Sequence, residues 1–154
     1  MIKARVMSNS NFHFPSEAPA VAMIANGTGI APFLGMVMDN NKRVPISLYA
    51  GFRHNNLLAK QYQEFASAEI ERQYLSKFEI AFSREAESRY VMDLIRRDAL
   101  QFVDLLEKKG IIMICGSLNM QKDVEKVLEE LSLAKNNKSL DHYKENNQIL
   151  TDCY

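Results

Sequence analysis

An apolar run of strand length, a glycine-rich turn and a second apolar stretch follow one another in residues 20–33, whose sequence is AVAMIANGTGIAPF. Glycines in such a turn let the backbone approach a ligand, and the first turn of a following helix presents unpaired N–H groups and a positive dipole end. Pro32 suits that first turn because it has no N–H to leave unpaired. The stretch predicts either a pyrophosphate-binding strand–turn–helix unit or an ordinary turn of an α/β protein.

Three further apolar runs predict strands, at residues 44–51, 78–82 and 111–116. Their hydrophobicity is continuous rather than alternating, which is typical of strands that are buried on both faces of a parallel sheet. The C-terminal residues 139–154 predict one short helix followed by a last strand over 148–154.

Helical patterns separate these strands. Residues 58–70 and 91–108 have helical spacing, the second with a break near Asp98, and a third amphipathic pattern includes Met120, Val124, Val127, Leu128 and Leu131. Lys108, Lys109 and Gly110 predict a cationic last turn and a glycine stop. The order predicts an α/β fold: a doubly wound, mainly parallel five-stranded sheet with helices on both faces.

Length and composition predict one globular domain, since 154 residues with 47% hydrophobic and 25% charged residues suit a single core. Nineteen basic residues balance nineteen acidic ones, so we expect no nucleic-acid partner. No apolar run reaches the roughly 20 residues of a membrane span. Cys115 and Cys153 are far apart in sequence, which favours free thiols in a reducing compartment. We expect a cytoplasmic protein, or one on the cytoplasmic face of a membrane-anchored parent, with no metal site.

Candidate phosphate ligands follow the predicted strands. The turn pattern G-x-G-x-x-P departs from the dinucleotide fingerprint G-x-G-x-x-G. Arg53 stands after the second strand, where an NAD site has an acid, and it is either a phosphate ligand or a solvated surface arginine. Ser83, Arg84, Arg89 and Tyr90 suit a ribose phosphate beside an adenine ring, and they also fit an ordinary polar loop.

Several motifs in order make a more specific pattern than any one of them, and the sequence resembles the NADP-binding domain of the ferredoxin-NADP reductase superfamily. The similarity is strongest to the diflavin reductases, which include cytochrome reductase, sulfite reductase flavoprotein and nitric oxide synthase reductase. It extends from about Phe12 to Tyr154. The motifs that carry it are residues 27–33, 51–54, 81–84, 90–91, 115–116, 119–120 and 123–124, with a terminal aromatic residue.

The resemblance implies a role for each matching position. Gly27, Thr28 and Gly29 match the turn that holds the pyrophosphate, and Arg53 matches an arginine near the phosphates. Ser83 and Arg84 match the pair that binds the 2′-phosphate and selects NADPH, and Tyr90 matches a tyrosine that contacts the same phosphate. Three further positions match a hydride-transfer site and its flavin cover: Cys115, Asp152 and Tyr154.

Each of these last three positions also has a simpler interpretation. Cys115 suits a small buried residue at a strand end, Asp152 a solvated acid and Tyr154 a frayed terminus. Hydride transfer to a flavin depends on close ring-to-ring approach with water excluded, which makes positioning the main task of such residues.

The sequence departs from the family pattern at three positions. Met92 replaces the usual glutamine, Arg89 stands one position away from the usual lysine, and Ser117 replaces an aspartate in a loop that is one residue shorter. We therefore expect a preference for NADPH whose strength these changes alter.

The FAD domain of the family has no counterpart before Pro15. We expect residues 1–15 to be a linker or remnant of that missing FAD-binding barrel and residues 16–154 to be the NADP-binding domain. The expected cofactors are NADPH and, in the complete enzyme, FAD. The expected partners are an FAD domain in the parent chain or a separate subunit, and a downstream electron acceptor. The alternative to such an enzyme module is a non-catalytic nucleotide-binding or interaction domain. A free-standing Rossmann dehydrogenase is disfavoured by Pro32 and by the absence of an acidic residue after the second strand.

Overall fold

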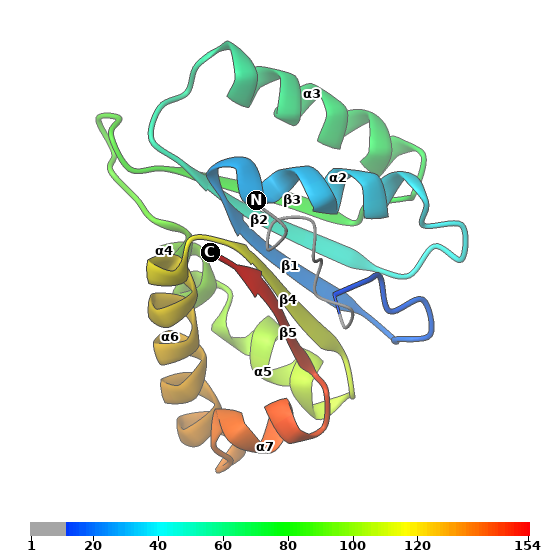
Figure 1. The fold of residues 1–154 in the computed structure, drawn as a ribbon, viewed down its shortest axis with the longest axis vertical. Helices are drawn as coiled ribbons and strands as arrows, with labels where there is room; N and C mark the ends of the chain where they lie inside the picture. Colours follow the sequence, from blue (N-terminus) through cyan, green and yellow to red (C-terminus); the bar gives the residue numbers. More distant parts are fainter. Residues whose placement is uncertain (1–11) are drawn as a thin grey trace, which may run out of the picture.

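The computed structural model describes residues 12–154, and within them one five-stranded sheet forms the centre of the molecule (Figure 1). Its strand order is β3-β2-β1-β4-β5, and every neighbouring pair is parallel. The predicted α/β sheet is confirmed, and it is wholly parallel. The strands are β1 (Val21–Asn26), β2 (Ile46–Phe52), β3 (Lys77–Phe82), β4 (Ile111–Gly116) and β5 (Ile149–Cys153).

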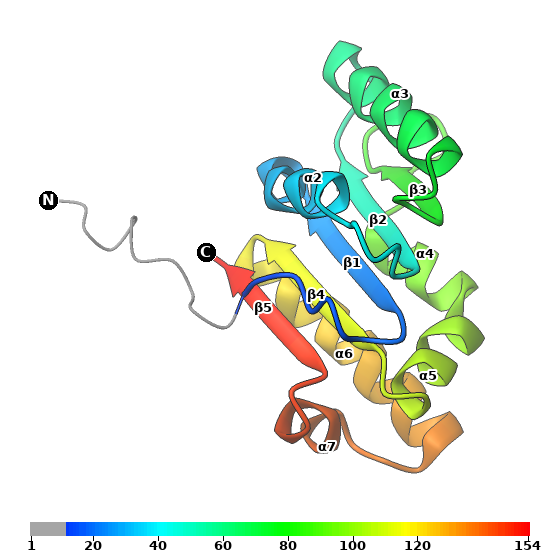
Figure 2. The same ribbon diagram turned by 90° about the vertical axis from the view of Figure 1, so that its right-hand side faces the viewer.

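Helices cover both faces of the sheet, as predicted (Figures 1 and 2). One face carries α2 (Ile30–Met38) and α3 (Leu57–Glu71). The other carries α4 (Val91–Arg97), α5 (Ala99–Glu107) and α6 (Leu118–Asn136), with the short α7 (Leu140–Glu145) leading into β5. The short terminal helix and the last strand predicted over 139–154 are therefore also present.

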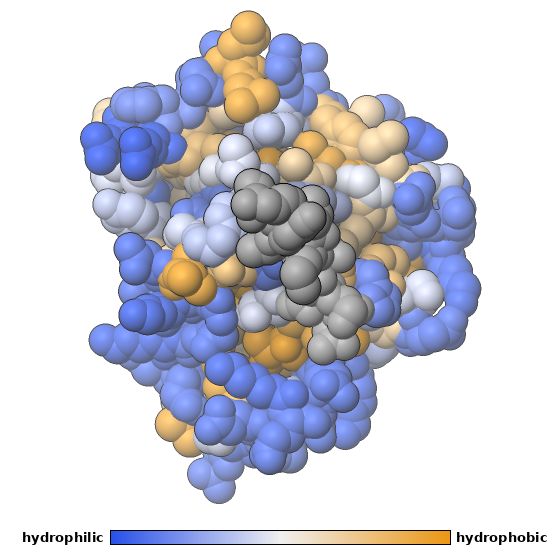
Figure 3. All heavy atoms as spheres, in the orientation of Figure 1, coloured by the Kyte–Doolittle hydropathy of each residue, from blue (hydrophilic) through white to orange (hydrophobic). Residues whose placement is uncertain are grey.

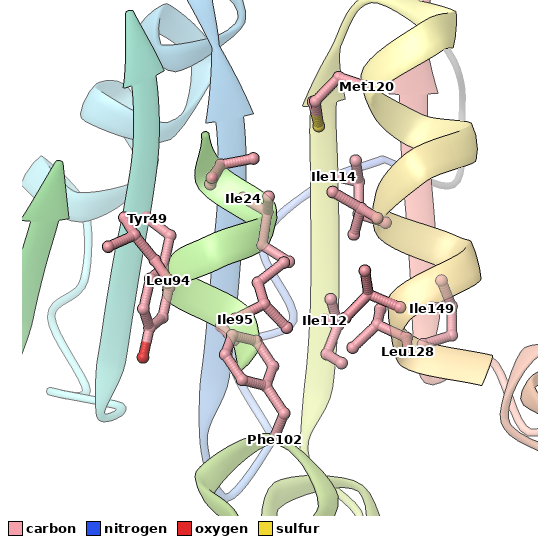
Figure 4. Packing of buried hydrophobic residues seen from close by; sticks show 14 of the residues in the cluster. Ile24, Tyr49, Leu94, Ile95, Phe102, Ile112, Ile114, Met120, Leu128 and Ile149 are labelled. Atoms are coloured by element: carbon pink, nitrogen blue, oxygen red, sulfur yellow. The ribbon is translucent and has the colours of Figure 1, made fainter. Parts of the chain in front are cut away.

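Consecutive residues of one strand point to opposite faces of the sheet, so they belong to two different hydrophobic cores. Ile24, Ile112 and Ile114 point toward α4 and α6, where they meet Leu94, Ile95 and Leu128 (Figure 4). Met23 and Met113 belong to the core under α2 and α3. All of these side chains are buried, which is why the strand sequences are continuously apolar.

The helical pattern over 91–108 breaks at Asp98, which separates α4 from α5 as predicted. The Asp98 carboxylate accepts hydrogen bonds from the Tyr49 hydroxyl (2.7 Å), Lys77 Nζ (2.6 Å) and Arg97 Nε (3.0 Å). The Arg97 hydrogen bond, with those of Lys77 and Tyr49, holds the pKa of Asp98 well below its usual range. The break is therefore fixed to β2 and β3 by charge-assisted hydrogen bonds.

Helix α5 ends at Glu107, so Gly110 follows the helix end as predicted, whereas the lysines of the predicted cationic last turn come after the last helical residue. The left-handed conformation belongs to Lys109, with φ 71°, and not to Gly110. Gly110 is required for space instead, because a Cβ there would lie 2.5 Å from Cγ of Leu105 and 2.9 Å from its carbonyl oxygen.

Strand β1 pairs with β2 on one side and with β4 on the other, so the chain runs outward from β1 in both directions. In open α/β sheets, ligands bind at the carboxyl ends of the strands beside such a switch point. Residues 12–18 lie on the face that carries α2, where the Phe12 ring packs 5.9 Å from that of Phe33. The linker predicted over residues 1–15 lies mostly outside the described residues.

Candidate nucleotide-binding site

The turn after β1 is a short 3₁₀ turn, Gly27–Gly29, that leads directly into α2. Gly27 has φ 55°, a left-handed conformation that favours glycine, and the space beside its Cα is open. Gly29 is buried, and a Cβ there would lie 2.3 Å from the carbonyl oxygen of Cys115. The first glycine therefore allows the left-handed backbone conformation, and the second allows the turn to lie against the end of β4.

A pocket of about 730 Å³ opens at the carboxyl edge of the sheet. It is bordered by the ends of β1, β2 and β3 and by the first residues of α3, α4 and α6. Six of the predicted site residues line it: Gly27, Arg53, Ser83, Arg84, Arg89 and Tyr90. Residues from four separate segments of the chain therefore meet at one pocket of a size that suits a small ligand.

The arginines of this pocket have no carboxylate partner among the described residues. Arg72, Arg96 and Arg97, which lie elsewhere, each pair with a glutamate. The guanidiniums of the pocket form no such pair within residues 12–154, and they belong to Arg53, Arg84 and Arg89. Guanidiniums gathered without counter-ions favour an anionic ligand, and phosphate matches their fork of donors.

Helix N-termini add to this positive potential. The N-cap residues of α3, α4 and α6, which are Asn56, Tyr90 and Ser117, all line the pocket. Asn56 accepts a hydrogen bond from the Ala59 N–H (3.0 Å), and Ser117 accepts one from the Met120 N–H (3.1 Å). The positive ends of these helix dipoles therefore meet at the pocket.

Two loops on one side of the pocket are tied together. The Arg84 N–H donates to the Arg53 carbonyl (2.8 Å), so the backbones of these two arginines are adjacent. The Glu85 carboxylate accepts from the Asn55 N–H (2.8 Å) and lies 3.5 Å from Nδ1 of His54. These hydrogen bonds hold the loops after β2 and β3 together, and both loops carry arginines that line the pocket.

Apolar side chains from the first turns of α3, α4 and α6 also line the pocket. Leu58, Val91, Met92 and Met120 line it, and Met92 is the residue that stands where the resemblance expects glutamine. Figure 3 shows apolar surface at the beginning of α3, where Leu57 is 72% and Leu58 52% exposed. These apolar side chains offer dispersion contacts to a flat ring, and Met92 adapts well to such contacts.

The remaining predicted residues form a second group at the ends of β1, β4 and β5, the terminal cluster: Thr28, Gly29, Cys115, Asp152 and Tyr154. Cys115 and Asp152 are register partners on neighbouring strands. The Tyr154 hydroxyl lies 3.3 Å from Oγ1 of Thr28. None of the five lines the pocket, but Thr28 directly follows Gly27, which does. The two groups therefore meet at the turn after β1.

The Cys115 thiol is 2% exposed. Burial, with a smaller contribution from the Asp152 carboxylate, raises the pKa of Cys115 to about 12. The side chain is therefore a neutral thiol at physiological pH.

Sequence reasoning missed Asn26, which connects the turn after β1 to the start of α6. Its Oδ1 accepts from the Ser117 N–H (3.0 Å), and its Nδ2 donates to Oγ of Ser117 (3.2 Å). A Cβ on Gly116 would lie 2.0 Å from Asn26 Oδ1, so this glycine makes room for the amide. Asn56 was also missed, although an Asn before an amphipathic run is a sequence signal for a helix N-cap.

A parallel sheet whose switch point gathers helix N-termini and arginines without carboxylate partners among the described residues is typical of a nucleotide-binding α/β domain. A family model described as "Oxidoreductase NAD-binding domain" matches residues 23–126, and the chain belongs to this family.

The curated relatives are sulfite reductase flavoprotein, cytochrome P450 reductase and methionine synthase reductase, which confirms the resemblance to the diflavin reductases. The sulfite reductase [NADPH] flavoprotein alpha-component of Mannheimia succiniciproducens is 32% identical over 139 residues, which are 84% of this chain and 23% of that protein. NADPH–cytochrome P450 reductase of Aspergillus oryzae is 32% identical over 133 residues (80% and 19%). Methionine synthase reductase of Rattus norvegicus is 29% identical over 147 residues (80% and 20%). The chain spans less than a quarter of the length of these three relatives.

Among the described helices, none combines the length and the apolar composition that crossing a bilayer requires.

Proposed function

We propose that this chain is the NADPH-binding module of a flavin-dependent oxidoreductase and that it positions NADPH for hydride transfer to FAD held by another domain or subunit. The observation that carries the proposal is the group of guanidiniums of Arg53, Arg84 and Arg89, which share one pocket without carboxylate partners among the described residues. Three phosphate groups of NADPH are the anions that such a pocket would accommodate.

The pocket binds the adenosine end in this proposal. Ser83, Arg84 and Arg89 bind the 2′-phosphate, and Tyr90, which is 55% exposed, offers its ring to adenosine. A 2′-phosphate is absent from NADH, so charge-assisted hydrogen bonds to it select NADPH.

In this proposal the turn after β1 and the terminal cluster bind the pyrophosphate and the nicotinamide end of the cofactor. Gly27 to Gly29 and Arg53 hold the pyrophosphate, which places the nicotinamide beside Cys115, Asp152 and Tyr154. NADPH, when bound, supplies the hydride. The buried Cys115 thiol and the neighbouring Asp152 shape the side of that site and exclude water from it.

The flavin and the final acceptor belong to the complete enzyme. All three relatives are named reductases, two with NADPH in the name and one as a flavoprotein, and the matched part of this chain is less than a quarter of their length. We propose that FAD is bound mainly outside this domain and that electrons pass onward from it to a downstream acceptor.

Calorimetric titration of the chain with NADP⁺ and NAD⁺ tests the proposal. NADP⁺ should bind more tightly, and Arg84→Ala should weaken NADP⁺ by about 1.5–3 kcal/mol while leaving NAD⁺ nearly unchanged, because the lost hydrogen bond is to a charged group. The matched control is Arg43→Ala, since Arg43 stacks on Tyr74, 4.8 Å from its ring centroid, and does not line the pocket. Equal affinity for both dinucleotides, or binding of neither, would contradict the proposal.

A further inference from the structure

The loop between β3 and α4 projects from the carboxyl edge of the sheet (Figure 1) and contains two Ser–Arg pairs, Ser83–Arg84 and Ser88–Arg89. Two hydrogen bonds bring these pairs together at the base of the loop. The Ser88 hydroxyl donates to the Ser83 carbonyl (2.7 Å), and the Arg89 N–H donates to the Phe82 carbonyl (3.0 Å). The backbones that carry Arg84 and Arg89 are therefore adjacent.

The two pairs are held in different ways. The Ser83 N–H donates to the Phe52 carbonyl (2.9 Å) and the Arg84 N–H to the Arg53 carbonyl (2.8 Å), so the first pair is fixed to the end of β2. The second pair is held to the first by the two hydrogen bonds given above. The residues from Arg84 to Tyr90 are all exposed. Hydrogen bonds at the base therefore set the shape of the loop more than packing does.

Ser88 differs from its neighbours in its relation to the pocket. Ser83, Arg84 and Arg89 line the pocket, whereas Ser88 does not. Its hydroxyl is used within the loop, where it closes the segment between the two arginines. Like charges repel, so two guanidiniums that are to approach one anion need a backbone that is fixed before the anion arrives.

We propose that Ser88 is a positioning residue, whose hydroxyl closes the loop after β3 so that the Arg89 guanidinium reaches the same phosphate group as that of Arg84. This inference rests on the proposed function. It assigns part of the preference for NADPH over NADH to a side chain that does not touch the ligand.

Calorimetric titration of Ser88→Ala with NADP⁺ and NAD⁺ tests the positioning role. NADP⁺ should bind about twofold to tenfold more weakly, as expected for the loss of one hydrogen bond, and the affinity for NAD⁺ should stay unchanged. Ser88→Thr keeps the hydroxyl and should bind both dinucleotides as the parent chain does. The matched control is Ser67→Ala, since Ser67 is an exposed serine of α3 that does not line the pocket.

A double variant shows whether Ser88 acts through Arg89. Arg89→Ala already removes the guanidinium that Ser88 positions, so adding Ser88→Ala should weaken NADP⁺ no further. Three results would overturn the inference: unchanged NADP⁺ affinity in Ser88→Ala, an equal loss for NAD⁺, or a loss that adds to that of Arg89→Ala.

A measurement without ligand separates this inference from the proposed function. The Arg89 amide proton, which is bonded to the Phe82 carbonyl, should exchange with water faster in Ser88→Ala than in the parent chain or Ser88→Thr, as followed by NMR. Equal exchange in all three chains would refute the loop closure whether or not NADP⁺ binds. Faster exchange in the variant, with a parent chain that binds neither dinucleotide, would instead refute the proposed function and the NADPH preference assigned to Ser88.

Discussion

Because the Cys115 thiol is buried, it should make the free energy of unfolding depend on pH. Its pKa is raised to about 12 in the folded chain, against 9.0 for an ordinary thiol, so the unfolded chain loses this proton first as the pH rises. The stability that depends on the neutral thiol is complete below about pH 9 and is lost between about pH 9 and pH 12. Cys115 should therefore lower the free energy of unfolding by up to about 1.4 kcal/mol for each pH unit in that interval.

Urea unfolding of the parent chain and of Cys115→Ala at several pH values measures this contribution. The parent should lose stability more steeply than the variant above pH 9, while burial of Tyr49 and Tyr143, which raises their pKa values, affects both chains alike. Parallel pH profiles would show that Cys115 does not titrate differently in the two states.

Individual residues differ in how well the sequence predicts them. Arg84 and Tyr90 follow a strand within a short polar loop, and the chain places them in one pocket with Arg53. The contact between Cys115 and Asp152 depends on which strands are neighbours, and hydrophobic periodicity contains no information on strand order. Asn26 was missed for a similar reason, since its partner Ser117 follows β4.

Among the elements, the β1–α2 unit contains two glycines whose replacement by alanine should change the free energy of unfolding in opposite directions. Gly29→Ala would place a methyl group 2.3 Å from the Cys115 carbonyl oxygen, and backbone cannot move aside cheaply, so we expect a loss of about 1–3 kcal/mol in the free energy of unfolding. Gly35→Ala lies within α2 with open space around the new methyl group, and it should stabilise the chain by about 0.4–1 kcal/mol. Chemical unfolding at pH 7 compares the two, and similar effects of both variants would contradict the packing argument.

The break between α4 and α5 is stabilised by the Asp98 carboxylate. Asp98→Asn keeps the shape but removes the charge that Lys77 and Arg97 contact, so we expect a loss of about 1.5–3 kcal/mol at pH 7. Because the pKa of Asp98 is lowered on folding, its contribution is present above its ordinary value of 3.8 and is lost as the pH falls below it. The difference between parent and variant should therefore shrink in unfolding measurements below about pH 4, and a constant difference would contradict the charge-based account.

Element boundaries were predictable where local chemistry sets them. The four apolar runs, the break at Asp98 and the final strand all appear in the structure. The stop after α5 was predicted, but the role of Gly110 was not, because a glycine beside a helix end can provide either a left-handed conformation or space. The pattern Lys-Lys-Gly does not distinguish these uses, whereas the packing of Gly110 on Leu105 does.

At the scale of the whole molecule, the ligand-facing groups gather at one edge of the sheet. Hydrogen exchange with NADP⁺ bound should therefore slow at residues 53–56, 83–90 and 117–120, which border the pocket. Residues 39–44 and 72–76, which precede β2 and β3 at the opposite edge, should change only through global stabilisation, about 2.7 kcal/mol at a hundredfold excess over Kd. Protection spread evenly over both edges would contradict binding at the carboxyl edge.

The central place of β1 also has a consequence for synthesis. Val21 of β1 pairs with Ile111 of β4, so one side of the central strand stays without its partner until most of the chain has left the ribosome. Long-range parallel pairing is slow to form, and an open apolar strand edge is prone to pair with another chain. We infer that newly made chains are most vulnerable to aggregation before β4 emerges, and that chaperone binding during translation matters most in that interval.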